Sequence, residues 1–164
     1  FLYAAHIARA LPRARIVCVR RHPMDTCLSN FRQFFGDGSP FHGYALDLLD
    51  TGRYYLQFEA LMREWNTRWP GRIHEVAYED LIDEQEATTR SLLAFCGLDW
   101  DPRCLAFEQN EAPVATASAV QVRSGIYRSS KGRWRHLSER LAGLRDLLVA
   151  GGLQIEPFTG AGHG

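Results

Sequence analysis

Residues 14–29, ARIVCVRRHPMDTCLS, join an apolar strand, a basic turn and the start of a helix. The run ARIVCV at 14–19 is continuous, apolar and rich in β-branched residues, which is typical of a strand buried on both faces. A proline and an acidic residue then suit the first turn of a helix, which we expect over 24–35. The turn between the two elements is basic and consists of Arg20, Arg21 and His22.

Outside this stretch, the sequence pattern predicts mostly helices and one more strand. We expect a second strand at 72–78, helices at 2–11, 44–69, 84–96 and 134–149, a short helix after Asp101-Pro102, and a long ordered loop at 111–130. Gly52 is expected to break or kink its helix, and Gly97 to cap the end of another. Strands alternating with helices predict an α/β fold whose parallel sheet is covered by helices on both faces.

Composition excludes several functional classes. The 164 residues suit one domain, and a formal net charge of zero gives no reason to expect binding to nucleic acid or to a membrane surface. Four cysteines form no CxxC pair and six histidines show no ligand spacing, so we expect free thiols and no metal. A G-x-S-x-G elbow, the mark of many hydrolases, is absent.

The basic turn has the residue types of a phosphate-binding site. Arg21 follows a strand at the carboxyl edge of the predicted sheet, where ligands bind in open α/β folds. A guanidinium can bind two phosphate oxygens, and the hydroxyl of Ser29, one turn beyond Asp25, can bind a third. On spacing alone, an arginine that simply pairs with Asp25 is an equally good interpretation.

The segment RHPMDTCLS, residues 21–29, resembles the 3′-phosphate-binding motif of the sulfotransferase family. The resemblance implies that Arg21 and Ser29, eight positions apart, bind the 3′-phosphate of the sulfate donor 3′-phosphoadenosine-5′-phosphosulfate (PAPS). It favours Arg21 over Arg20, which we expect to face the other side of the strand. In tyrosylprotein sulfotransferases a further arginine assists binding of the 3′-phosphate. This chain has Gln33 at the corresponding position, so the resemblance does not carry that arginine contact over.

Two further segments carry the resemblance along the chain. VAYEDLIDEQEATTRSLLAFCGLDWD, residues 76–101, is similar to a segment of tyrosylprotein sulfotransferases and implies a place near the nucleotide for Tyr78. ATASAVQVRSGIYRSSKGRWRHL, residues 115–137, resembles the donor-binding loop of bacterial tetratricopeptide-linked sulfotransferases. The resemblance implies that residues 118–127 wrap the nucleotide, with Ser118 at the transferring sulfate and Gln121 in the wrapping segment, and that Arg133 replaces a family lysine that reaches the phosphates.

The family's 5′-phosphosulfate loop, which resembles a nucleotide P-loop in shape, has no counterpart in the sequence, nor do the acidic base and the stabilising lysine near it. We therefore expect a partial, N-terminally truncated sulfotransferase domain at 1–158, with the P-loop-NTPase-like fold of the family, followed by a disordered tail at 159–164.

The resemblance implies an enzyme that transfers a sulfuryl group from PAPS to an acceptor hydroxyl and releases PAP, the desulfated product. Candidate acceptors are protein tyrosine and small hydroxyl compounds, and helical repeats are expected upstream, as in relatives. The alternative is an inactive, nucleotide-binding remnant; a P-loop kinase is disfavoured because no lysine-bearing loop is visible. Without a signal-peptide pattern or an apolar run of membrane-spanning length, we expect a cytoplasmic protein, although residues before Phe1 could carry a signal.

Overall fold

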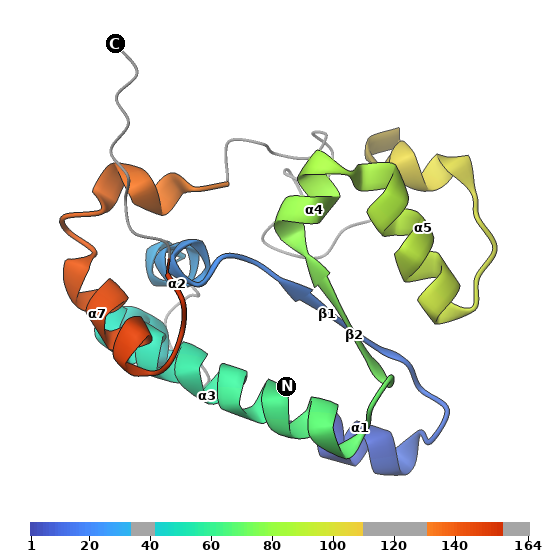
Figure 1. The fold of residues 1–164 in the computed structure, drawn as a ribbon, viewed down its shortest axis with the longest axis horizontal. Coiled ribbons are helices and arrows are strands. Elements are labelled where there is room, and N and C mark those ends of the chain that lie inside the picture. Colours follow the sequence, from blue (N-terminus) through green and yellow to red (C-terminus); the bar gives the residue numbers. More distant parts are fainter. Residues whose placement is uncertain (34–41, 110–130, 156–164) are drawn as a thin grey trace. The chain divides into compact units, whose positions relative to one another are not determined.

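The computed structural model describes residues 1–33, 42–109 and 131–155 (Figure 1). The chain divides into two compact units. We call Phe1–Leu2, His22–Glu64 and Gly132–Gly164 the helical unit, and Tyr3–Arg21 with Trp65–Lys131 the sheet unit. The predicted tail at 159–164 and the end of the domain at 158 lie outside the described residues.

The sheet unit contains two parallel strands, β1 (Ile16–Arg20) and β2 (Ile73–Ala77). Ile16 lies opposite Ile73 and Arg20 lies opposite Ala77, so both strands end at the same edge. The two predicted strands and their parallel direction are therefore confirmed.

Burial of the first strand differs from the prediction. Ile73 and Val76 of β2 are buried, but Val17 and Val19 of β1 are 37% and 58% exposed. The continuous apolar run predicted a strand covered on both faces, which requires neighbouring elements on each side. Val17 and Val19 are two positions apart and share one face of the strand, so in the described part of the chain this face of β1 is open to solvent.

Helices of the sheet unit follow the prediction closely. They are α1 (Ala4–Ala10), α4 (Tyr78–Asp83), α5 (Gln85–Cys96) and the 3₁₀ turns η2 (Pro102–Leu105) and η3 (Phe107–Gln109). The sequence pattern does not predict α4 and η3: the strand expected at 72–78 ends at Ala77, and Tyr78 begins α4 instead. Gly97 ends α5 in the left-handed conformation at φ 71°, with Leu98 N–H donating to the Leu93 carbonyl at 2.9 Å, which confirms the predicted cap.

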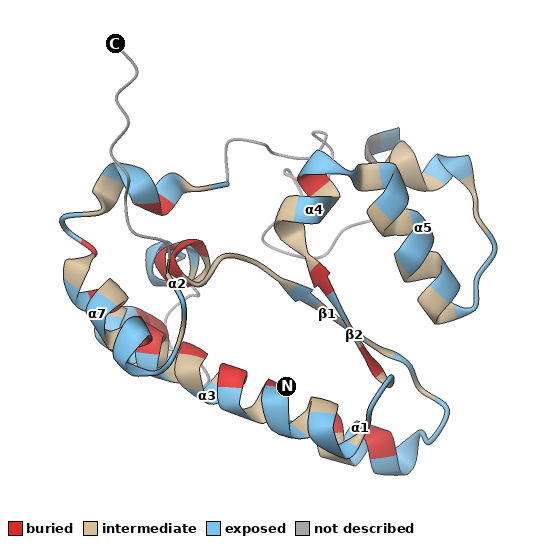
Figure 2. Ribbon diagram, in the orientation of Figure 1, coloured by how far each residue is buried: buried red, intermediate tan, exposed pale blue. Residues whose placement is uncertain are grey.

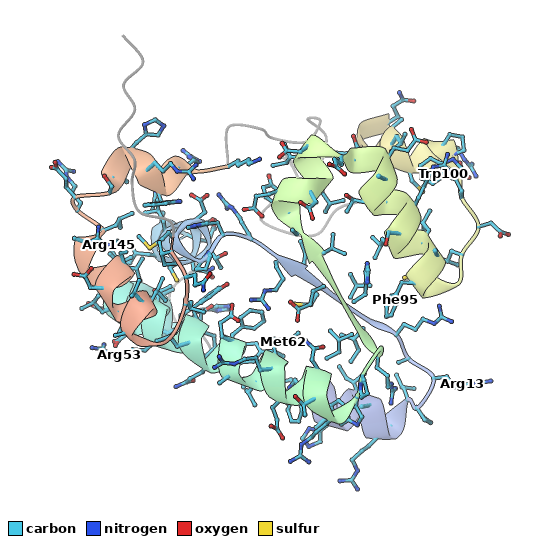
Figure 3. The ribbon with its side chains drawn as sticks, viewed as in Figure 1. Arg13, Arg53, Met62, Phe95, Trp100 and Arg145 are labelled. Carbon is cyan, nitrogen blue, oxygen red and sulfur yellow. The ribbon has the colours of Figure 1, made fainter. Side chains whose placement is uncertain are left out.

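Arginines connect the elements of this unit. The Arg72 guanidinium donates to the carbonyls of Leu11 and Ala14, both at 3.2 Å, just after α1. Arg15 donates to the Phe95 carbonyl, and its guanidinium lies 5.8 Å from the centroid of the Phe95 ring, on α5. Leu11 and Phe95 (labelled in Figure 3) lie at the C-terminal ends of α1 and α5, so the bonds to their carbonyls satisfy groups that a helix end leaves without partners.

The helical unit consists of α2 (Pro23–Arg32), η1 (Gly43–Leu46), the part of α3 (Leu48–Arg68) up to Glu64, η5 (Arg133–Leu137) and α7 (Ala142–Ala150). Figure 2 shows buried residues on α2, α3 and α7. The core of the unit is formed by buried side chains of these elements, namely Met24, Cys27, Leu28, Tyr55, Trp134, Leu141, Leu144 and Leu148.

Two of the predicted helices are each divided into two elements, at points that no local sequence pattern marks. The expected helix at 44–69 is η1 followed by α3, and the division falls at Asp47, whose carboxylate accepts the Leu49 N–H at 2.8 Å. Gly52 does not break α3; it lies inside the helix and is buried. The expected helix at 134–149 is η5 and α7, separated by four residues.

No helix in the described ranges combines the length and apolar character needed to cross a bilayer. All four cysteines have free thiols in the structure.

Candidate functional site

Arg21 and Tyr78 meet at one edge of the sheet. Because Arg20 is opposite Ala77 in parallel strands, the next residue of each chain segment leaves the sheet at its carboxyl edge. The guanidinium carbon of Arg21 lies 5.5 Å from the centroid of the Tyr78 ring, within the range of a cation–π contact. Two of the six predicted site residues are thus neighbours within the sheet unit.

Arg20 has a different environment. Its Nη1 donates to Glu75 Oε2 on the adjacent strand at 2.8 Å, and the other Glu75 oxygen accepts from Asn66 Nδ2 at 2.6 Å. The two charged side chains are 24% and 33% exposed, so this ion pair is partly screened by water. Arg20 therefore pairs with the neighbouring strand, while Arg21 contacts the residue that begins α4.

Helix α2 begins where the sequence predicted, with Pro23 in its first turn. The N-cap is His22, whose Nδ1 accepts the Met24 N–H at 3.3 Å. The His22 ring stacks on the Trp134 indole with centroids 5.2 Å apart and planes 9° apart. His22 therefore both caps α2 and packs on the buried tryptophan of η5.

Asp25 is the residue whose role the sequence did not reveal. It is 1% exposed, and its two carboxylate oxygens accept the backbone N–H groups of Gly132 at 2.7 Å and Trp134 at 3.0 Å. From the sequence, an acidic residue in the first turn predicts a favourable interaction with the helix dipole or a pair with Arg21, but not bonds to distant backbone amides. Its bonds instead hold the segment that carries Arg133.

Ser29 and Arg133 belong to the helical unit, and both are exposed. Ser29 lies on α2 four positions after Asp25, and Arg133 is the first residue of η5. Gln33, at the end of α2, is exposed as well. Ser118, Gln121 and the predicted nucleotide-wrapping loop lie outside the described residues.

Cys27 lies within the RHPMDTCLS motif, but its environment disfavours a chemical role. The side chain is fully buried, and burial raises the pKa of its thiol to about 12 from an ordinary value of 9.0. A thiol that stays protonated in an apolar core is a poor nucleophile. Cys27 is therefore part of the core.

This raised pKa predicts a specific pH dependence. Above pH 9 the Cys27 thiol of the unfolded chain loses its proton, whereas the buried thiol of the folded protein keeps it. This deprotonation favours the unfolded state, so the free energy of unfolding falls as the pH rises from 9 towards 12. We expect Cys27→Ala to lose less unfolding free energy than wild type between about pH 9 and 11 in urea titrations. Cys104→Ala is the control; parallel curves for wild type and Cys27→Ala would contradict the prediction.

Across the three described ranges, no three His, Cys, Asp or Glu side chains are grouped so that they could hold a metal ion.

Parallel strands with an arginine at their carboxyl edge, followed at once by a helix, are typical of α/β proteins that bind nucleotides. Residues 1–102 match the model of the sulfotransferase family. The chain belongs to this family.

Two relatives give the extent of the likeness. An uncharacterized protein of Aquifex aeolicus (strain VF5) is 36% identical over 156 residues, which cover 95% of this chain and 20% of the relative. The solved sulfotransferase domain from the curacin biosynthetic pathway has a similar fold, with a TM-score of 0.54 at 15% identity over 87% of this chain and 54% of that domain. The chain thus spans about a fifth of the Aquifex relative and about half of the solved domain.

Proposed function

We propose that this chain is the donor-binding part of a sulfotransferase that transfers a sulfuryl group from PAPS to an acceptor hydroxyl. The observation that carries the proposal is the meeting of Arg21 and Tyr78 at the carboxyl edge of two parallel strands, with a guanidinium-to-ring distance of 5.5 Å. Membership of the sulfotransferase family supports the reaction class.

The side chains present suit an anionic nucleotide. Arg21 is half-buried at the strand edge, where a fixed guanidinium can bind two oxygens of a phosphate. The exposed hydroxyl of Ser29 is of a type that donates to a phosphate oxygen, and the exposed guanidinium of Arg133 can bind phosphate oxygens as well. We assign Arg21 and Ser29 to the 3′-phosphate, Tyr78 to the nucleotide and Arg133 to the phosphates, with Ser118 and Gln121 in the segment that wraps the donor.

The test compares Arg21→Ala with Arg20→Ala, measuring the affinity for PAP by calorimetry in the full-length protein. Loss of hydrogen bonds to a charged group costs about 1.5–3 kcal/mol, so Arg21→Ala is expected to weaken binding roughly 10- to 100-fold. Arg20→Ala is the matched control, since it removes the adjacent arginine, whose ion pair with Glu75 is partly exposed. Equal affinities for Arg21→Ala and wild type, or an equal loss in Arg20→Ala, would refute the assignment.

For the acceptor we propose only its chemical class, a compound with a hydroxyl group. Protein tyrosine is the candidate that the resemblance to tyrosylprotein sulfotransferases favours, and upstream helical repeats would suit a protein acceptor. Transfer of radioactive sulfate from PAPS to tyrosine-containing peptides and to small phenols tests both acceptor types. Binding of PAP without transfer to either would support the alternative of a nucleotide-binding remnant.

A further inference from the structure

The segment Gly132–Trp134 is fixed to the start of α2 by three contacts, all within the helical unit. Asp25 accepts the Gly132 and Trp134 N–H groups at 2.7 and 3.0 Å, and the Trp134 ring stacks on His22. Trp134 is 2% exposed and Asp25 is 1% exposed, so these contacts are shielded from water. We call the two hydrogen bonds of Asp25 the Asp25 latch.

The latch is strong for physical reasons. A carboxylate buried to this extent is costly unless its oxygens are hydrogen-bonded, and bonds to an ionised acceptor are about twice as strong as neutral ones. The two amides can converge on one carboxylate because Gly132 adopts φ 72°, a left-handed conformation. The left-handed conformation is therefore the reason that this turn suits glycine.

Arg133 is the residue between the two bonded amides, so the latch fixes its backbone while its side chain stays exposed. The helix that carries Asp25 also carries Ser29 four residues later, on the same face. We propose that Asp25 is a positioning residue that holds Arg133 in register with Ser29, so that both reach the phosphates of one donor molecule. This inference rests on the proposed function.

Hydrogen exchange measures the latch directly. Asp25→Asn replaces one acceptor oxygen with an NH₂ group, which cannot accept an N–H bond, and removes the negative charge from the other oxygen. One of the two amides, Gly132 or Trp134, is therefore expected to exchange about tenfold faster or more, and the other is expected to exchange faster than in wild type. Amides of α7 (Ala142–Ala150) are expected to keep their wild-type rates. General acceleration that includes α7 would show loss of the fold, and unchanged rates at 132–134 would show that no latch exists; either result overturns the inference.

Asp47→Asn is the matched control. The Asp47 carboxylate also accepts two backbone amides, those of Leu49 and Asp50 at 2.8 and 2.9 Å, and it belongs to the same unit. The chemical change is the same, but it affects the start of α3. We expect Asp25→Asn to weaken PAP binding about tenfold and Asp47→Asn to leave it unchanged. Equal losses in the two variants would contradict a specific role for Asp25.

A double-mutant cycle tests whether Asp25 acts through Arg133. If it does, Asp25→Asn weakens PAP binding in wild type but has little further effect once Arg133→Ala has removed the guanidinium. Additive losses would overturn the inference. Failure of wild type to bind PAP would overturn the proposed function and the donor-binding role of the latch together, whereas normal PAP binding with an insensitive Asp25→Asn would overturn the latch alone.

Discussion

Trp134→Ala is expected to lower the free energy of unfolding by about 3–5 kcal/mol, the usual cost of removing a large buried aromatic side chain. Trp134 is 2% exposed and belongs to the core of the helical unit together with Leu141 and Leu144. Its ring also stacks on His22, the cap of α2, so the substitution removes packing from the helix start as well as from the core. Urea titration followed by circular dichroism measures the change.

Trp100→Ala is the control for this prediction. Trp100, labelled in Figure 3, is half-buried in the sheet unit. The guanidinium carbon of Arg90 lies 3.8 Å from the centroid of the Trp100 ring. Its loss should cost about 1 kcal/mol, the value of a partly exposed cation–π contact with some packing. Trp134→Phe, which keeps an aromatic face for His22, should fall between the two variants. A loss at Trp134 no greater than that at Trp100 would contradict the prediction.

The sequence predicted those elements that are determined by residues close together in the chain. The apolar run before Arg20 became β1, and Gly97 caps α5 because a left-handed residue closes the helix end through bonds within six residues. Spacing to Ser29 favours Arg21 over Arg20 as the phosphate ligand, which stays a prediction, and the structure pairs Arg20 with Glu75. Each of these inferences depends on neighbours in sequence or on the alternation of a strand.

Features with distant causes could not be predicted in this way. The bonds of Asp25 join it to residues 107 and 109 positions away, and one sequence carries no mark of such a pairing. Gly52 has the residue type of a helix break, but it lies inside α3 beneath side chains of α7. A glycine can allow a turn of the backbone, or it can allow another element to pack closely against a helix. The sequence does not distinguish these two uses, because the packing partner is distant in the chain.

Leu144→Ala is the second substitution with a large expected effect. Leu144 is 0% exposed in the core of the helical unit, and removal of such a side chain costs about 2–5 kcal/mol in unfolding free energy. Val149→Ala is the control on the same helix, since Val149 is 50% exposed and should lose well under 1 kcal/mol. Urea titrations of both variants measure the difference.

The cavity left by Leu144→Ala faces Gly52, which gives the prediction a sharper form. A Cβ atom at Gly52 would lie 2.7 Å from Leu144 Cδ1 and 2.9 Å from Leu147 Cδ2. In wild type this overpacking costs about 1–3 kcal/mol and outweighs or cancels the gain of about 1 kcal/mol that alanine brings to a helix. In Leu144→Ala the first clash is gone and half-buried Leu147 can shift, so Gly52→Ala should recover about 1 kcal/mol. If Gly52→Ala destabilises both backgrounds equally, α3 and α7 are not packed through this contact.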